Sequence, residues 1–297
     1  MNIPAAWQTS RMTSCLHAAR QVVAGRPLND ARIAKALAEI AHRFDVELRE
    51  ILAHSNAAAA FLAGPDLWQL LLELSLDDPA SSELAARFCC RWGHDSRADG
   101  AMESRVADTL SQLNSTLLEV LPRLPFELPL RVGPLREQWE ARGPGFLAQA
   151  ARLTQLPLAT LGSRVVLVHP VLGGDGTPHF LADTIQFEAV LVNANWRLPE
   201  TMRLGWLLMQ LAAWPLFAAI PLLHRRQFVA TVTLLPAIEA GQHVELAPPD
   251  PRLLREALDA WLPNQLPPGA AARIASLVPQ SDQPWRSAAR AFYTLWT

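Results

Sequence analysis

The sequence predicts an α+β fold that is mostly α-helical, with a small antiparallel sheet in the second half of the chain. Three observations predict this. Apolar residues recur at intervals of three and four over most of the first half. Two β-branched segments, 164–168 and 184–192, lie close together in the second half. Half of the 297 residues are hydrophobic and only 18% are charged, which provides enough apolar surface for a sizeable core.

The first half is expected to form a series of helices separated by turn residues. Asn29 and Asp30 have the short polar side chains that cap helix N-termini, so a helix should begin near Ala31. Further helices, bounded by capping residues, glycine or proline, are expected over 67–76, 81–92 and 102–121. Residues 1–121 are therefore interpreted as a helical region.

Four prolines at positions 122, 125, 129 and 134 follow this region. Because proline disfavours a helical conformation in the residue before it, we expect a semi-extended Pro-rich linker over 122–134 and a domain boundary there. Residues 135–297 are then an α+β region with a hairpin and a buried apolar helix. Its first helix begins at Pro134 and should be interrupted at Gly143-Pro144-Gly145.

The predicted strands lie on either side of a loop that is rich in glycine. Segments 164–168 and 184–192 are expected to pair antiparallel, with an exposed and mobile loop over 173–177 in the long connection between them. Segment 228–235 is a third strand candidate, with a helix as the alternative. Three short helices are expected over 251–296, separated by prolines.

The segment 204–223 contains 20 consecutive residues without a formal charge, which is long enough to span a membrane. Pro215 and Pro221 would interrupt such a helix, whereas Pro199 and Glu200 are typical of the start of a helix in a soluble protein. We therefore interpret the segment as a buried helix that breaks at Trp214-Pro215, followed by a second short apolar element. A membrane-associated segment is the alternative.

Composition excludes several classes of protein. The 26 basic and 28 acidic side chains nearly cancel, so no overall field would attract nucleic acid, and no nucleic-acid partner is expected. Three cysteines are too few for a disulfide-stapled secreted scaffold. Residues 1–8 lack the basic start and apolar run of an export signal, so a cytoplasmic location is predicted.

The candidate site residues flank the glycine loop. His169 and His179 could converge across a hairpin as two metal ligands, or act with Asp175 in acid–base catalysis. The run Gly173–Gly176 is not followed by the last glycine of the G-x-G-x-x-G spacing and lacks the Lys-Ser/Thr pair of phosphate-binding loops, so it predicts a plain loop and no cofactor.

The run from Cys89 to Asp95 contains two cysteines and a histidine, which makes it a second place to consider a metal. Adjacent cysteines on a helix point about 100° apart, whereas metal sites usually space them by two or more residues. We therefore interpret Cys89 and Cys90 as small residues at the end of a helix, and His94 ranks behind the loop histidines as a ligand.

The order of elements resembles that of the zincin metallopeptidases. A helical first half is followed by a strand that ends in Glu188-Ala189-Val190-Leu191, and then by a long helix over 199–213. In that family the helix after the edge strand carries two histidines and a glutamate. The corresponding segment here, 201–207, contains neither residue type, so the resemblance implies an inactive relative and transfers no functional residue.

Two functions follow from these observations. The first is a non-catalytic protein-interaction or scaffold protein, because ten tryptophans and 24 prolines suit contact surfaces. Its partner would be a protein, and the sequence does not identify it. The alternative is a divergent metal-dependent hydrolase centred on His169, Asp175 and His179, so the sequence leaves the question of catalysis open.

Overall fold

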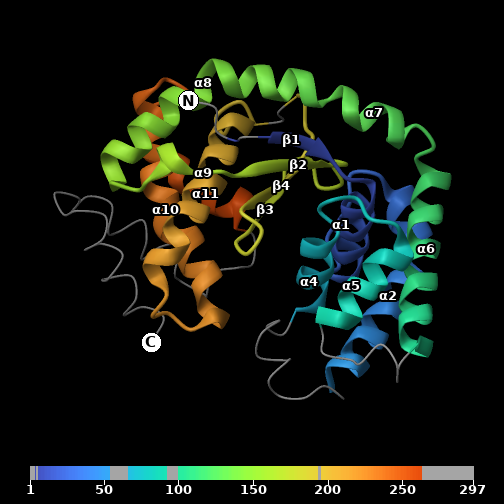
Figure 1. Ribbon diagram of the computed structural model, residues 1–297. Coiled ribbons are helices and arrows are strands. Elements are labelled where there is room, and N and C mark those ends of the chain that lie inside the picture. Colours follow the sequence, from blue (N-terminus) through green and yellow to red (C-terminus); the bar gives the residue numbers. More distant parts are fainter. Residues whose placement is uncertain (1–3, 5, 54–65, 92–99, 193–194, 263–297) are drawn as a thin grey trace. The chain divides into compact units, whose positions relative to one another are not determined.

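The computed structural model describes residues 4, 6–53, 66–91, 100–192 and 195–262 (Figure 1). The chain divides into two compact units. Unit 2 comprises Gln8–Val132 and Val166–Gly174, and unit 1 comprises Met1–Trp7, Gly133–Val165 and Asp175–Thr297. Helices predominate and a single small sheet is present among the described residues, so the predicted mostly helical α+β fold is confirmed.

Unit 2 is a bundle of helices. They are α1 (Arg11–Val23), α2 (Ala31–Ala53), α4 (Leu67–Leu74), α5 (Ser81–Arg91), α6 (Gly100–Val120) and α7 (Leu124–Leu130). α1 packs on α2, α4 and α6, and both α2 and α5 pack on α6 (Figure 1). Leu37 and Phe44 lie on one face of α2 and are fully buried, as their spacing predicts. Phe44 and Trp68 of α4 form an edge-to-face contact with their ring centroids 5.5 Å apart.

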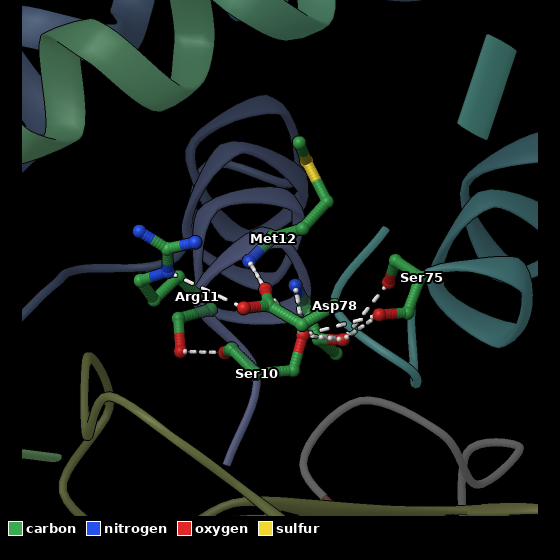
Figure 2. A network of polar contacts seen from close by, with 7 residues as sticks. Ser10, Arg11, Met12, Ser75 and Asp78 are labelled. Atoms are coloured by element: carbon green, nitrogen blue, oxygen red, sulfur yellow. Dashed lines mark hydrogen bonds and ion pairs between the residues drawn. The ribbon is translucent and has the colours of Figure 1, made fainter. Parts of the chain in front are cut away.

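A polar network joins the N-terminus of α1 to the turn after α4 (Figure 2). Ser10 Oγ accepts a hydrogen bond from the Thr13 N–H at 2.9 Å and donates one to the Asp78 carboxylate at 3.2 Å. The same carboxylate accepts from the Met12 N–H at 2.8 Å and from Arg11 Nε at 3.3 Å. Asp78 adopts a φ of 55°, which aspartate tolerates better than most residues. The negative charge of Asp78 also interacts favourably with the positive end of the α1 dipole.

Replacing Asp78 with alanine should lower the free energy of unfolding by about 2 kcal/mol, because the Met12 amide and the Arg11 guanidinium lose their acceptor. Asp78→Gly removes the same carboxylate but relieves the backbone strain at positive φ, so it should cost less than alanine. Urea denaturation and hydrogen exchange at the Met12 amide measure both effects. Wild-type stability in the alanine variant would contradict this role.

The sheet has the order β1-β2-β4-β3, with strands β1 (Ala6–Thr9), β2 (Arg164–Val168), β3 (Gly176–His179) and β4 (Thr184–Glu188). β3 and β4 form an antiparallel hairpin in which His179 pairs with Thr184. The Arg164 N–H donates to the Asp183 carbonyl at 3.2 Å, and Arg164 Nε donates to Thr184 Oγ1 at 2.9 Å. These contacts join the starts of β2 and β4, so the two strands run in the same direction and the sheet is mixed.

The sequence prediction for the sheet needs three corrections. The expected antiparallel pairing of 164–168 with 184–192 is wrong, because the connection between them contains β3, which supplies the antiparallel partner of β4. The expected exposed loop over 173–177 is also wrong, because all five residues are half-buried and Gly176 and Thr177 belong to β3. The third correction is β1, which the sequence did not predict.

Unit 1 contains the remaining helices, and these pack around α9. They are α8 (Val132–Thr154), which begins at the last residue of unit 2, η1 (Leu158–Thr160), α9 (Glu200–Ala213), η2 (Trp214–Phe217), α10 (Leu222–His243) and α11 (Leu253–Trp261). α9 contacts β3, β4 and α10, and every one of its residues is buried. Trp206 of α9 stacks on Trp261 of α11 at 5.3 Å and donates its indole N–H to the Ala230 carbonyl at 3.0 Å.

The prolines of the predicted linker do not prevent helix formation. Residues 122–134 form α7 and the start of α8, so the expectation of a semi-extended linker is wrong. Pro125 and Pro134 each lie in the first turn of a helix, where the missing N–H leaves no helical bond unmade. The units nevertheless separate inside this region, at Val132 and Gly133. α8 continues through Gly143-Pro144-Gly145 without the expected interruption.

The structure also decides between the alternatives for segments 228–235 and 204–223. Residues 228–235 belong to α10, so they form a helix and not a third strand. α9 begins after Pro199 and ends at Ala213, which confirms the helix and its break at Trp214-Pro215. The expectation that all of 204–223 is buried is wrong beyond Ala213, because Leu216 is 47% exposed.

Of the three helices expected over 251–296, α11 is present, and residues 263–297 lie outside the described part. No helix of the described residues is both long and apolar enough to cross a membrane.

Gly205 allows α9 to pack closely on α8. A Cβ atom at this position would overlap the ring of Phe146, which is fully buried. Gly205→Ala should therefore lower the free energy of unfolding by about 2 kcal/mol through overpacking. In combination with Phe146→Leu the cost of the alanine should fall, because the smaller side chain makes room. Urea denaturation of the wild type, the two single variants and the double variant gives this coupling, and additive effects would contradict it.

Candidate functional site

The structure places the predicted site residues in two different units. His169 follows β2 and belongs to unit 2, where its backbone N–H donates to Ser14 Oγ at 3.0 Å. The residue is half-buried and lines a pocket beside α6 and α7. Asp175 and His179 belong to unit 1. Within the described residues, the structure defines no site that holds both histidines.

His179, which the sequence makes a candidate metal ligand or acid–base group, does not reach solvent. It lies in β3 with no exposed surface, and its Nε2 lies 3.3 Å from Gln186 Oε1 on the neighbouring strand. Asp175, at the start of the hairpin, has its N–H 3.1 Å from the Glu188 carboxylate and its carbonyl 2.9 Å from the Glu188 N–H. These hydrogen bonds join β3 to β4 and satisfy polar groups within the hairpin, so they are structural contacts.

The remaining metal-ligand candidates are dispersed. Cys89 is buried and Cys90 is exposed on α5, while His94 lies outside the described residues. Burial raises the pKa of the Cys15 thiol to about 12, so this thiol stays protonated at neutral pH. In the described part of the chain no three histidine, cysteine or acidic side chains group together in a way that could hold a metal ion.

A buried ion pair occupies the first turn of α9. Glu200 and Arg203 form it, and Arg203 is 2% exposed. The guanidinium also lies 4.4 Å from the ring centroid of Phe187 on β4, so one face of the charge rests on an aromatic ring. Its Nε and Nη1 have no hydrogen-bond partner among the described residues. Glu188, at the end of β4, is fully buried and acts electrostatically on Glu200.

The Glu200–Arg203 pair lies in a part of α9 that packs in the core of unit 1. Burial raises the pKa of Glu200 above its ordinary value of 4.5, the charge of Arg203 opposes that rise, and Glu188 adds to it. α9 is the helix in which the zincin resemblance would place the catalytic residues. Its positions 201–207 are instead buried against β3, β4 and α10, where a substrate would have to displace the core.

The surface where α9 ends has a different character. We name it the Trp214 surface, and it consists of Phe180, Leu181, Trp214, Leu216, Leu222, Arg225 and Arg226. Phe180 and Trp214 stack with ring centroids 3.8 Å apart and planes 8° from parallel. The guanidinium of Arg225 lies 4.9 Å from the Trp214 ring, and that of Arg226 lies 5.3 Å from the Phe180 ring. Two aromatic rings and two cations thus form one chain of contacts.

Three leucines make this surface apolar as well as cationic. Leu181 is 74% exposed, Leu216 is 47% exposed and Leu222 is 46% exposed. Arg225 donates from Nε to the Ile220 carbonyl at 3.0 Å and from Nη2 to the Ala218 carbonyl at 2.5 Å. These bonds hold the guanidinium above the indole. The sequence analysis missed this surface, although the break at Trp214-Pro215 and the basic residues after Leu223 mark its position.

The stability of the protein should respond to pH through Glu200. Because its folded pKa is raised, the folded state binds a proton more tightly than the unfolded state in the pH range above 4.5. The contribution of Glu200 to the free energy of unfolding is therefore fully present below that range and is lost as the pH rises through the raised pKa.

Glu200→Gln does not titrate, so the stability of the wild type relative to this variant should fall as the pH is raised from 4.5. Urea denaturation of both proteins at a series of pH values measures the difference, in which the titration of distant groups cancels. A difference that increases with pH would mean that Arg203 outweighs the effect of burial.

Comparisons of this chain with protein-family models, with curated proteins and with solved structures found no match. A function has therefore to be assigned from the residues of this chain and their chemistry.

Proposed function

We propose that this chain is a non-catalytic interaction or scaffold protein that binds a protein partner through the Trp214 surface. The observation that carries the proposal is the chain of contacts Arg226, Phe180, Trp214 and Arg225, bordered by exposed leucines. Tryptophan and arginine are enriched among the residues that dominate binding energies at protein interfaces. Exposed leucines close to such anchors add apolar area that a partner can cover.

The geometry also indicates what the partner offers. Arg225 is fixed by two backbone carbonyls and by the indole, so little side-chain entropy remains to be lost when a partner binds. A guanidinium held in this way can present its free edge to a carboxylate. We expect a partner whose contact surface combines an apolar centre with acidic residues at its rim.

The zincin resemblance fits the same proposal. β4 ends at Glu188 and α9 follows it, which is the order of elements that suggested the resemblance. The start of α9, which would carry the histidines and the glutamate, holds the Glu200–Arg203 pair instead. A degenerate metallopeptidase-like fold would thus retain this helix for packing. The proposal includes a cytoplasmic location, where the thiols of Cys15, Cys89 and Cys90 would stay reduced.

Site-specific photo-crosslinking in cells that produce the full chain tests this function. A photo-crosslinking amino acid replaces Leu216, and the matched control carries it at Val46, which is 56% exposed on α2. We expect one defined protein to be captured from position 216 and not from position 46. Adding Arg225→Glu should lower the yield about tenfold or more, because the cation that would meet the partner's acidic rim is reversed.

Each other outcome counts against the proposal. Identical capture from positions 216 and 46 would mean that the labelled proteins are bystanders. Capture of lipid from position 216 would identify a membrane surface as the ligand in place of a protein. A captured protein whose yield is unaffected by Arg225→Glu would show that the arginine–aromatic contacts do not contribute.

A further inference from the structure

A pocket in unit 2 lies where α6 ends and α7 begins. Its volume is about 210 Å³, and all of its lining residues belong to unit 2. They come from the C-terminal end of α6, from the turn into α7, from α7 and from the residue that follows β2. The described lining consists of Val120, Leu121, Pro122, Arg123, Leu124, Glu127, Leu128, Arg131 and His169.

The apolar part of this lining is firmly anchored. Leu124 and Leu128 stand four residues apart on α7 and are 3% and 1% exposed, so this face of the helix is buried. Leu121 and Pro122 form the turn that precedes α7. The pocket therefore has an apolar wall formed by well-buried leucines.

The charged part of the lining is mainly cationic. The lining contains two guanidinium groups, those of Arg123 and Arg131, and one carboxylate among its described residues, that of Glu127. Arg123 and Glu127 stand four residues apart, yet Arg123 makes no ion pair with any residue in the described part of the chain. Asp30 lies close enough to His169 to interact electrostatically, but its carboxylate already binds Arg32 at 2.7 Å. The exposed guanidinium of Arg123 is thus available to a ligand.

We propose that this pocket binds a small organic anion, with a carboxylate or phosphate group held by Arg123 and Arg131 and an apolar body against Leu124 and Leu128. Guanidinium groups bind both kinds of oxyanion through paired hydrogen bonds. Apolar walls with a few polar groups at one end are typical of small-molecule sites, and the volume limits the ligand to a compact molecule. This inference is independent of the Trp214 surface, which lies in the other unit.

Titration calorimetry with the full chain tests the proposal with three probes of similar size, namely phenyl phosphate, benzoate and the uncharged benzyl alcohol. We expect binding of one or both anions at millimolar concentration or below and no binding of benzyl alcohol. Arg123→Gln should weaken the binding about tenfold, because it removes a charge-assisted hydrogen bond. Glu127→Gln should strengthen it, because the one carboxylate among the described lining residues is neutralised.

Arg136→Gln is the matched control, because Arg136 is an exposed arginine that pairs with Glu140 and does not line the pocket. It should leave the binding unchanged. The relative affinities of phenyl phosphate and benzoate show whether the oxyanion is a phosphate or a carboxylate. Failure of both anions to bind would overturn the proposal, and so would equal weakening by Arg123→Gln and Arg136→Gln. Circular dichroism of each variant confirms that it is folded.

Discussion

The complete burial of α9 is the constraint on which unit 1 depends. A helix that has no exposed face needs partners on every side, and here β3 and β4 cover one part of it while α10 and η2 cover others. Gly205 permits the close approach of Phe146, and Trp206 finds a carbonyl for its indole N–H within the core. The cost of this burial is concentrated in the first turn, where Glu200 and Arg203 enter the core as ions. Their mutual attraction and the Phe187 ring offset part of the loss of hydration.

The same constraint explains why an apolar surface forms beyond Ala213. Pro215 cannot continue the hydrogen-bond ladder of α9, so the chain leaves the core and turns through η2 into α10. The residues of this turn are as apolar as the helix before it, but Leu216 and Leu222 remain almost half exposed. Stacking on Phe180 orders Trp214, and Arg225 is ordered in turn by the indole and two carbonyls. Aromatic residues and arginine are enriched in protein interfaces, so the composition of this surface is consistent with the proposed function.

Local signals in the sequence predicted the helices well, whereas pairings between distant segments escaped prediction. The capping residues before Ala31 and the break at Trp214-Pro215 act within one turn of helix, so both could be recognised from neighbours in the chain. The parallel pairing of β2 with β4 depends on β3, which is only four residues long and contains a proline. The burial of His179 depends on its partner Gln186, and the pocket at His169 depends on α6 and α7, which are distant in sequence. No periodicity could have placed these groups together.

The preference of this chain for arginine acquires a structural meaning at a few positions. Lys35 is the only lysine among 26 basic residues, and composition alone does not distinguish a codon bias from a requirement. At Arg203 and Arg225 the requirement is clear, because each guanidinium lies over an aromatic ring and also donates to an oxygen. The ammonium of lysine is compact and strongly hydrated, so it cannot combine stacking with planar hydrogen bonding. At exposed sites such as Arg87, which pairs with Glu83 on the same helix, lysine would serve equally well. The choice of arginine is therefore a physical constraint where a cation meets a ring, as it does in the core at Arg203 and on the Trp214 surface at Arg225.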